Sequence, residues 1–171
     1  MGKEKRVELL APAGNAEGFY GAVHAGADAV YLAGEYFGAR AYAENFTTEK
    51  LLECIRYAHL LNRKIYLAVN TLVKESELPR LLDYLTPFYE AGLDAVIVQD
   101  PGVLRLIRQY FPRLKIHAST QMTICSGYGA SLLKRMGVSR IVPARELSLE
   151  EVRSMREKAG IEIETFIHGA M

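Results

Sequence analysis

Short apolar stretches alternate along this chain with longer amphipathic stretches. The apolar stretches are rich in Val, Ile, Leu and Tyr and are apolar almost throughout, which is typical of parallel strands that helices cover. The pattern predicts seven strands, at residues 7–11, 29–33, 64–70, 95–99, 115–119, 140–144 and 161–167. It predicts six amphipathic helices in the intervals between them.

The predicted helices carry recognisable start and stop signals. Asn15 is a capping residue before the first helix, and Asp100 is followed by Pro101, a residue favoured in a first helical turn. Ser148 and Glu151 have the spacing of a capping box. Four helices are expected to end at glycines that take a left-handed conformation. These are Gly26, Gly92, Gly137 and Gly160.

Similar phrases follow three of these glycines. Ala-Gly-Ala-Asp-Ala-Val-Tyr at 25–31 resembles Ala-Gly-Leu-Asp-Ala-Val-Ile at 91–97, and 136–142 is a weaker copy. A helix that ends at glycine and is followed at once by a strand is a βα unit returning to its sheet. The repetition predicts a TIM-like (β/α) barrel with parallel strands, although a doubly wound sheet would give a similar pattern.

The predicted barrel is incomplete. A full barrel has eight strands and usually about 250 residues, whereas this chain has 171 residues and seven predicted strands. No closing helix follows the last strand. We therefore expect one domain over residues 1–171, a partial barrel whose first and last strands are open edges. Such edges favour association between copies of the chain.

Composition narrows the function classes. Half of the residues are hydrophobic, 24% are charged and the formal net charge is +1, so nothing points to bulk binding of nucleic acid or of a membrane surface. The composition does not decide whether folding brings basic residues together in a local patch. No signal peptide or long apolar span is visible, which predicts a cytoplasmic chain without membrane contact. Cys54 and Cys125 form no metal-binding spacing and are expected to be reduced, buried thiols.

Polar residues gather where the predicted strands end, which is where barrel enzymes place their active sites. Each has a structural alternative: a helix cap for Asp100, an exposed pair for Arg145 and Glu146, and loop support for Asn70 and Gln121. His117, deeper in its strand, is expected to be a core histidine. Pro12, Gly14 and Gly34 lie in loops at the same rim, where glycine allows a ligand to approach the backbone. The polar candidates are Asn70, Gln99, Asp100, Ser119, Gln121, Arg145, Glu146 and His168.

The last predicted strand separates into two faces. Ile161, Ile163, Thr165 and Ile167 are expected to face the helices, and Glu162, Glu164, Phe166 and His168 to face the interior. A carboxylate inside a barrel is costly unless it is paired or protonated. Glu164 is therefore either a site residue or half of a structural ion pair, and His168 could share a proton network with it.

The residues alone do not define a reaction. The chain has no HExxH, GxSxG or phosphate-binding loop. Several longer stretches, however, resemble the U32, or collagenase-like, peptidase family. They are Glu-Leu-Leu-Ala-Pro-Ala-Gly at 8–14, His-Ala-Ser-Thr-Gln at 117–121, Ala-Arg-Glu-Leu-Ser at 144–148 and Glu-Thr-Phe-Ile-His-Gly-Ala-Met at 164–171.

The resemblance runs along the whole chain and carries several implications. The family signature continues into cysteines, so the chain is expected to stop just before them. The family name implies peptidase activity, whereas other members resemble proteins that hydroxylate RNA or quinone precursors with an iron–sulfur cluster. Thiolates suit such clusters. We expect no cofactor in this chain and an iron–sulfur cluster in the full-length protein.

The leading hypothesis is a U32-family domain that acts on a peptide, on RNA or on a small aromatic compound. Glu164 and His168 are the catalytic candidates. The substrate-binding candidates are Asn70, Gln99, Ser119, Gln121, Arg145 and Glu146. The alternatives are a non-catalytic barrel that binds an RNA partner or a small anion, with Arg145 as the anion clamp, and an unrelated barrel enzyme.

Overall fold

Seven parallel strands form one curled sheet in the computed structural model, which describes residues 7–39 and 45–168. The strands are β1 (Leu10–Pro12), β2 (Ala29–Ala33), β3 (Lys64–Val69), β4 (Ala95–Val98), β5 (Lys115–Ala118), β6 (Arg140–Ile141) and β7 (Glu162–Ile163). The α-helices are α1 (Ala16–His24), α2 (Thr48–Leu60), α3 (Leu78–Glu90), α4 (Pro101–Tyr110), α5 (Gly127–Arg135) and α6 (Leu149–Ala159). Two short 3₁₀ helices are η1 (Glu75–Glu77) and η2 (Thr120–Met122).

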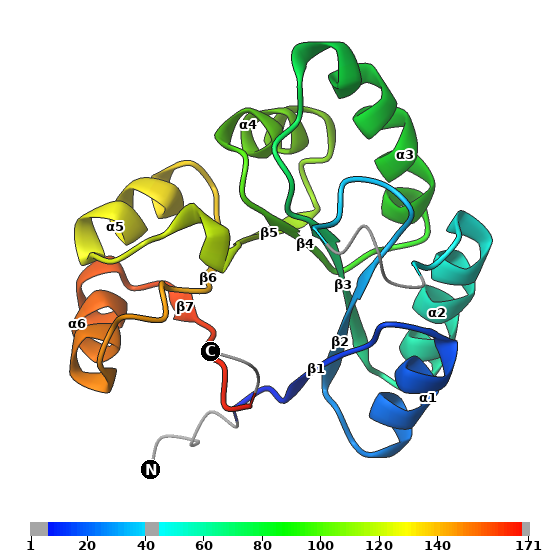
Figure 1. Ribbon diagram of the computed structural model, residues 1–171, viewed down its shortest axis with the longest axis horizontal. Coiled ribbons are helices and arrows are strands. Elements are labelled where there is room, and N and C mark those ends of the chain that lie inside the picture. The colour runs from blue at the N-terminus through cyan, green and yellow to red at the C-terminus, as the bar shows by residue number, and fades with distance from the viewer. Residues whose placement is uncertain (1–6, 40–44, 169–171) are drawn as a thin grey trace.

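The strands pair in sequence order, each with the next along the chain, and the six helices lie outside the curl (Figure 1). This is an α/β fold, an incomplete TIM-like barrel, and the predicted fold class is confirmed. The single order from β1 to β7 has no reversal, which distinguishes the barrel from a doubly wound sheet.

The predicted helix boundaries are also confirmed. The Asn15 side chain accepts a hydrogen bond from the Gly18 amide at the start of α1, and Ser148 and Glu151 form the capping box of α6. The glycines at the ends of four helices have positive φ: 97° at Gly26, 88° at Gly92, 96° at Gly137 and 57° at Gly160. Other residues rarely adopt this backbone conformation.

The strands separate into an outer and an inner face. In β3, Ile65, Leu67 and Val69 belong to the large core beneath the helices, while Tyr66 belongs to a second cluster inside the curl. That inner cluster also contains Ala29, Ala95 and Ile97, with Leu10 and Tyr31 packed against it. Residues of the outer and inner faces therefore alternate along the middle strands.

Three predicted strands, the first, the sixth and the last, are clearly wrong in length. The first begins at Leu10, and Val7 is 86% exposed; the last ends at Ile163, and Ile167 is 87% exposed rather than facing the helices. The last sheet bond runs from the Glu164 amide to the Ile141 carbonyl. β6 ends at Ile141 instead of continuing to residue 144, because Pro143 has no amide hydrogen to donate.

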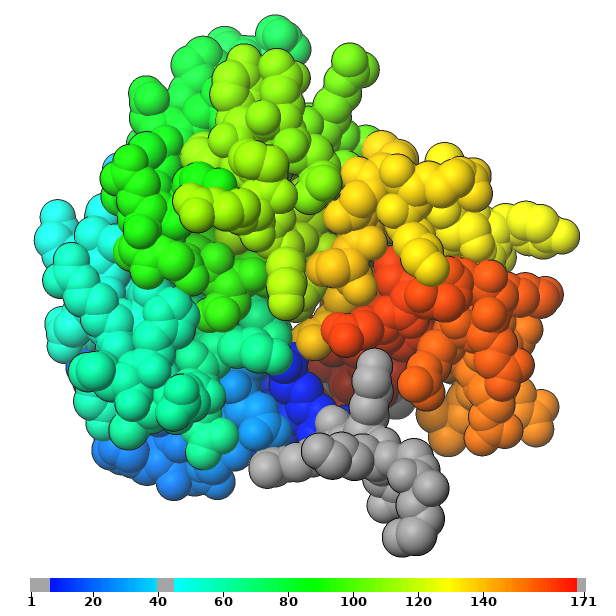
Figure 2. Space-filling view, turned by 180° about the vertical axis from the view of Figure 1, so that it is seen from behind, coloured from blue at the N-terminus to red at the C-terminus, as the bar shows by residue number. Residues whose placement is uncertain are grey.

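The edges of the sheet are β1 and β7, and the curl brings the two sides close to each other. Arg140 of β6 reaches Glu8, just before β1, at 2.8 Å. Seen from behind, the first described residues lie next to the C-terminal part of the chain (Figure 2). Residues 169–171, the end of the signature-like stretch, lie outside the described residues. Within the described ranges, none of the helices combines the length and apolarity needed to cross a membrane.

Candidate active site at the carboxyl ends of the strands

The parallel register places four inner residues of neighbouring strands at one level. Ala33 pairs with Ala68, Ala68 with Ile97, and Ile97 with His117. Because side chains alternate along a strand, the next inner positions toward the carboxyl ends are Asn70, Gln99 and Ser119. The register thus places these three predicted site residues on the same face, at neighbouring strand ends.

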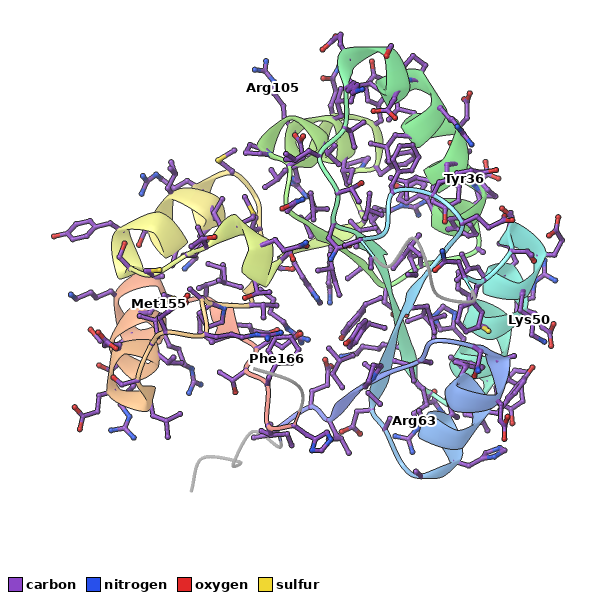
Figure 3. All side chains as sticks on the ribbon, in the orientation of Figure 1. Tyr36, Lys50, Arg63, Arg105, Met155 and Phe166 are labelled. Atoms are coloured by element: carbon purple, nitrogen blue, oxygen red, sulfur yellow. The ribbon has the colours of Figure 1, made fainter. Side chains whose placement is uncertain are left out.

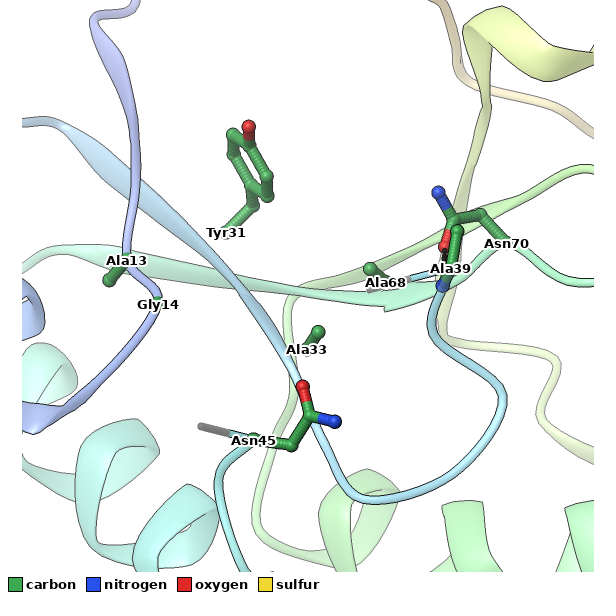
Figure 4. Close-up of a pocket in the computed structure, with 8 residues that line it drawn as sticks. All are labelled: Ala13, Gly14, Tyr31, Ala33, Ala39, Asn45, Ala68 and Asn70. Carbon is green, nitrogen blue, oxygen red and sulfur yellow. Dashed lines mark hydrogen bonds between the residues drawn. The ribbon is translucent and has the colours of Figure 1, made fainter. Parts of the chain in front are cut away.

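Asn70 takes part in a small hollow at this rim (Figure 4). The hollow has a volume of about 60 Å³. The Oδ1 atom of Asn70 accepts a hydrogen bond of 3.0 Å from the Ala39 amide. This bond fixes the Asn70 side chain with its NH₂ group pointing away from Ala39. The residues that line the hollow are Ala13, Gly14, Tyr31, Ala33, Ala39, Asn45, Ala68 and Asn70. Tyr31 and Asn45 were not among the predicted site residues; the position of Tyr31 on the inner face of its strand was the available signal.

Ser119 and Gln121 support each other beside this rim. Ser119 is only 3% exposed and caps η2 by accepting a hydrogen bond of 3.3 Å from the Gln121 amide. The Ser119 hydroxyl also donates to Gln121 Oε1 at 3.2 Å. Gln99 is half-buried, and Gln121 is exposed. Contact of these residues with a substrate remains a prediction.

Three further candidates lie in other surroundings. Asp100 caps α4, where its Oδ1 accepts hydrogen bonds from Gly102 and Val103, and its Oδ2 accepts one from Val73. The helix-cap alternative is therefore confirmed for Asp100. Arg145 is exposed, and its guanidinium lies 4.8 Å from the ring centre of Phe166, on the C-terminal segment (Figure 3). Glu146 is exposed.

Glu164 faces the interior, as predicted, and belongs to a cluster of charges around Arg140. Arg140 contacts Glu8 at 2.8 Å, Glu162 at 3.1 Å and Glu164 at 3.3 Å. Glu8 also accepts hydrogen bonds from Lys64 and from the Tyr66 hydroxyl. The ion-pair alternative for Glu164 is present in the structure.

His168 does not join this cluster. It is exposed and follows the last strand residue by five positions, so the alternation of β7 does not extend to it. The predicted network between Glu164 and His168 is not formed. A catalytic role for either residue remains a prediction.

The charge cluster lies toward the amino ends of the strands. Glu8 precedes β1, while Lys64, Arg140 and Glu162 are the first residues of β3, β6 and β7. In barrels this end serves stability rather than chemistry. Glu8 and Arg140 were not among the predicted site residues. The available signal was that Arg140 precedes the outward-facing Ile141, so that Arg140 lies on the inner face of its strand together with Val142.

Burial and hydrogen bonds shift two carboxyl groups of the cluster in opposite directions. Burial alone would raise the pKa of Glu8, but hydrogen bonds from Lys64, Tyr66 and Arg140 outweigh it and lower that pKa to about 2. For Glu164, burial dominates over the attraction of Arg140 and raises the pKa of the carboxyl group. Glu8 is therefore ionised near pH 7, whereas the surroundings of Glu164 disfavour the ionised form of its carboxyl group.

His117 is buried, as predicted, but one of its ring nitrogens is unsatisfied. It is 2% exposed, and its Nδ1 has no hydrogen-bond partner among the described residues. Its ring contacts Tyr66 edge-on, with centroids 4.6 Å apart. Burial, aided by the charge of Arg140, lowers the pKa of His117 to about 3, so the ring is neutral near pH 7.

Glu164→Gln is expected to match or exceed the wild type in thermal stability at pH 7. The raised pKa means that the folded state binds a proton more readily than the unfolded state, so ionised Glu164 costs stability at neutral pH. Thermal unfolding between pH 7 and pH 4 tests this. The wild type should approach the variant as the pH falls through the raised pKa, and a clear loss of stability in the variant at pH 7 would contradict it.

The two rim glycines differ in what surrounds them. A Cβ added at Gly14 would meet no heavy atom within 4 Å, so Gly14 leaves open space beside the hollow. A Cβ at Gly34 would overlap the Tyr84 hydroxyl and lie 2.9 Å from Leu51 Cδ1. The predicted approach of a ligand is therefore compatible with Gly14 and wrong for Gly34, where a side chain of the protein occupies the space.

The two cysteines do not form a metal site. Cys54 is buried in α2, where burial raises the pKa of its thiol to about 11, while Cys125 is exposed before α5, so the prediction that both are buried is wrong for Cys125. In the described part of the chain, no group of three or more His, Cys, Asp or Glu side chains could hold a metal ion. These residues therefore do not fit an iron–sulfur cluster.

Known proteins resemble this chain in sequence, and a solved structure resembles it in fold. The chain is 42% identical over 167 residues to tRNA hydroxylation protein P1 of Bacillus subtilis (strain 168), covering 98% of this chain and 40% of that protein. It is 40% identical over 166 residues to the 23S rRNA 5-hydroxycytidine C2501 synthase of Escherichia coli (strain K12), covering 97% of this chain and 25% of that protein. The chain thus spans less than half of either relative.

A solved structure described as the U32 peptidase Mk0906 has the same fold. Its TM-score is 0.77 at 17% identity, over 96% of this chain and 70% of that one. The family model described as peptidase family U32 matches residues 14–171. Since this match covers nearly all of the 171 residues, the chain belongs to peptidase family U32.

Proposed function

We propose that the full-length protein hydroxylates a base in RNA and that this barrel domain binds the RNA segment to be modified. The observation that carries the proposal is the similarity, along almost the whole chain, to two proteins named for RNA hydroxylation. The two alignments, at 42% and 40% identity, cover 98% and 97% of this chain, so they include both the strands and the rim loops.

The rim geometry supports binding of a heterocyclic base. The hollow combines an aromatic ring, Tyr31, with two carboxamide side chains, Asn45 and Asn70, on a wall of small residues. Unstacked RNA bases bind to proteins through stacking on aromatic rings and hydrogen bonds to their polar edges. The net charge of +1 is compatible with a local contact of this kind rather than with broad binding of the phosphate backbone.

The geometry supports peptide hydrolysis less well. Nucleophilic catalysis requires a Ser, Thr or Cys beside an activating base. Among the described residues, the hydrogen-bonded histidines are His24 and His59, and their partners are Tyr57 and Asp94. His117 and His168 make no hydrogen bond to a hydroxyl or thiol in the described ranges.

An iron–sulfur cluster in the full-length protein is part of this proposal. Such clusters are held by cysteine thiolates and supply electron-transfer chemistry. Cys54 lies buried behind the sheet and Cys125 lies on the surface before α5. We therefore assign no residue of this chain to the cluster, and the chain's part in the reaction is to bind and orient the RNA.

Deletion of the gene, followed by analysis of RNA nucleosides, tests the proposed function. Total tRNA and rRNA would be digested and searched for hydroxylated nucleosides by mass spectrometry. We expect one such nucleoside to be lost in the deletion strain and restored by the wild-type gene. Unchanged RNA, together with cleavage of gelatin by the purified full-length protein, would overturn the proposal in favour of a peptidase.

A further inference from the structure

We propose that the outer face of α4 and α5 binds the phosphate backbone of the RNA on which the full-length protein acts. The inference rests on the proposed function and adds a second contact surface, outside the hollow at the rim. We call this surface the basic strip and define it by Arg105 and Arg108 of α4 and by Tyr128 and Arg135 of α5. The two helices follow each other around the outside of the curl (Figure 1).

The formal net charge of +1 hides an uneven distribution of charge along the chain. Residues 101–145 contain six Arg and two Lys but no Asp or Glu. Residues 7–100, by contrast, contain 13 Asp and Glu against seven Arg and Lys. The net charge of the whole chain therefore does not describe the surface of α4 and α5, which is locally basic.

The three arginines of the basic strip carry charges that the described residues do not neutralise. Arg105, Arg108 and Arg135 are exposed, and none of them forms an ion pair with a described carboxylate. Lys134 differs from them, because its Nζ donates to two carbonyls at the end of α6, at 2.9 and 2.8 Å, and it is not part of the strip. Arginine binds phosphate through paired hydrogen bonds, so these three side chains suit a phosphate backbone.

Arg108 connects the two helices of the basic strip. Arg105 and Arg108 are three positions apart and share one face of α4, from which Arg105 projects outward (Figure 3). The Arg108 side chain lies against Gly137, just after α5, where an added Cβ would be 2.5 Å from Arg108 Nε. Arg135 is the last residue of α5. The cations of α4 therefore continue to the end of α5 where Arg135 lies.

An exposed aromatic ring lies on the same face of α5 as Arg135. Tyr128, Leu132 and Met136 follow one another at intervals of four residues and are 86%, 51% and 36% exposed. Arg135 comes seven residues after Tyr128, about two helical turns, so both side chains lie on this face. Proteins bind single-stranded RNA by combining cations for the backbone with aromatic rings for the bases. This combination favours RNA over an acidic protein as the partner.

The basic strip begins close to the candidate site and is narrow. Arg105 lies four residues, or about 6 Å along the helix axis, after the start of α4, which follows the carboxyl end of β4. Tyr128 is in the first turn of α5. Exposed carboxylates border the strip, with Glu90 at the end of α3 and Glu150 at the start of α6. An RNA held at the rim would therefore place only a few of its phosphates on the strip, which agrees with the net charge of +1.

The test measures binding of a fluorescent single-stranded RNA of mixed sequence to the full-length protein over a range of salt concentrations. The strip variant combines Arg105→Gln, Arg108→Gln and Arg135→Gln. A matched control variant removes the same number of cations on α2 and just after it, across the curl from α5 (Figure 1). It combines Lys50→Gln, Arg56→Gln and Arg63→Gln. Thermal unfolding checks that each variant is folded.

We expect the strip variant to lose part of the salt dependence of RNA binding. The logarithm of the affinity falls with the logarithm of the salt concentration by about 0.7 for each phosphate that a cation contacts in single-stranded RNA. Loss of three contacts should therefore reduce this slope by about two and weaken binding at low salt by roughly tenfold or more. The control variant should keep the slope of the wild type. If the strip variant does not fold, the single substitutions decide, each with a loss of about 0.7 in slope.

Tyr128 gives a readout that is independent of charge. Tyr128→Ala should weaken RNA binding by about tenfold at every salt concentration, as the loss of one stacked base would. Tyr128→Phe retains the ring and should bind as the wild type does. Weakening of both variants to the same extent would contradict a stacking role for this residue.

Several outcomes would overturn the inference. These are an unchanged slope in the strip variant and an equal loss of slope in the control variant. A third is sedimentation showing that the strip joins copies of the protein at low salt while RNA binding does not depend on it. Complementation of the deletion strain separates the two proposals. If the wild-type gene restores the hydroxylated nucleoside but the strip variant binds RNA and restores it equally well, only the basic strip fails. If the wild type restores nothing, the proposed function fails, whereas the binding assay still decides on the strip.

Discussion

Arg140→Met is expected to lower the free energy of unfolding by about 3–5 kcal/mol, the usual cost of removing one partner from a buried ion pair. The Arg140 side chain is 11% exposed, and the side chains of its partners Glu8 and Glu164 are 19% and 16% exposed. Without the guanidinium, the carboxylates of Glu8 and Glu164 would lie inside the barrel without the positive charge that pairs with both of them. Urea denaturation at pH 7 measures the effect.

The dependence on pH gives this prediction a second readout. In the wild type, the pKa of Glu8 is lowered from 4.5 to about 2, so its contribution to stability is present above pH 4.5 and is lost as the pH falls toward 2. Arg140→Met removes one cause of that shift, and the pKa of Glu8 should rise. The loss of stability on acidification should therefore be smaller in the variant than in the wild type.

Two further variants separate the cluster from general effects of substitution. Lys50→Met removes a cation from the exposed pair with Glu53 and should change stability little. The double variant Arg140→Met with Glu8→Gln should recover part of the loss, because one of the two stranded charges is gone. Equal denaturation midpoints for Arg140→Met and the wild type would show that the cluster does not stabilise the curl.

Local signals account for the parts of the fold that the sequence predicted well. The run Ile65, Leu67 and Val69 specifies an outer face without reference to any distant residue, and Gly26 and Gly160 end their helices through their own backbone freedom. The length of the last strand was predicted less well. It depends on its neighbour β6, which Pro143 shortens, and the alternation within residues 161–167 contains no information about that partner.

In the candidate site, too, features with a local signal were predicted and features that depend on distant residues were not. Asn70 was singled out because a polar residue at the end of an apolar strand is visible in the sequence, and the structure places it in the hollow at the rim. The pair of Glu8 and Arg140 was missed because 132 positions separate the two residues and only the curl brings them together. Gly34 was misread for a related reason. A glycine at a rim indicates close approach but does not tell whether a ligand or another side chain approaches.

Gly34→Ala is expected to destabilise the protein by about 1–3 kcal/mol, the usual cost of overfilling a packed core. The new methyl group would overlap the hydroxyl of Tyr84 and press on Leu51 Cδ1, and Tyr84 is fixed between Tyr36, Phe37 and Phe88. Gly34 also forms a bridge to Phe46, so its backbone cannot shift freely. Thermal and urea unfolding would measure the loss, with Gly14→Ala as the control at an open rim glycine.

Tyr84→Phe tests whether the overlap with the Tyr84 hydroxyl causes the loss of stability in Gly34→Ala, because it removes only the oxygen that the new methyl group would overlap. The Tyr84 hydroxyl is buried near the backbone of Tyr36 without forming a hydrogen bond of good geometry, so its removal alone should leave stability equal or slightly higher. In the double variant Gly34→Ala with Tyr84→Phe, the nearest ring carbon of residue 84 lies 3.2 Å from the new methyl group, which is tight but tolerable. Much of the loss should then be recovered. Purely additive effects of the two substitutions would show that Gly34 is required for a reason other than the space that Tyr84 occupies.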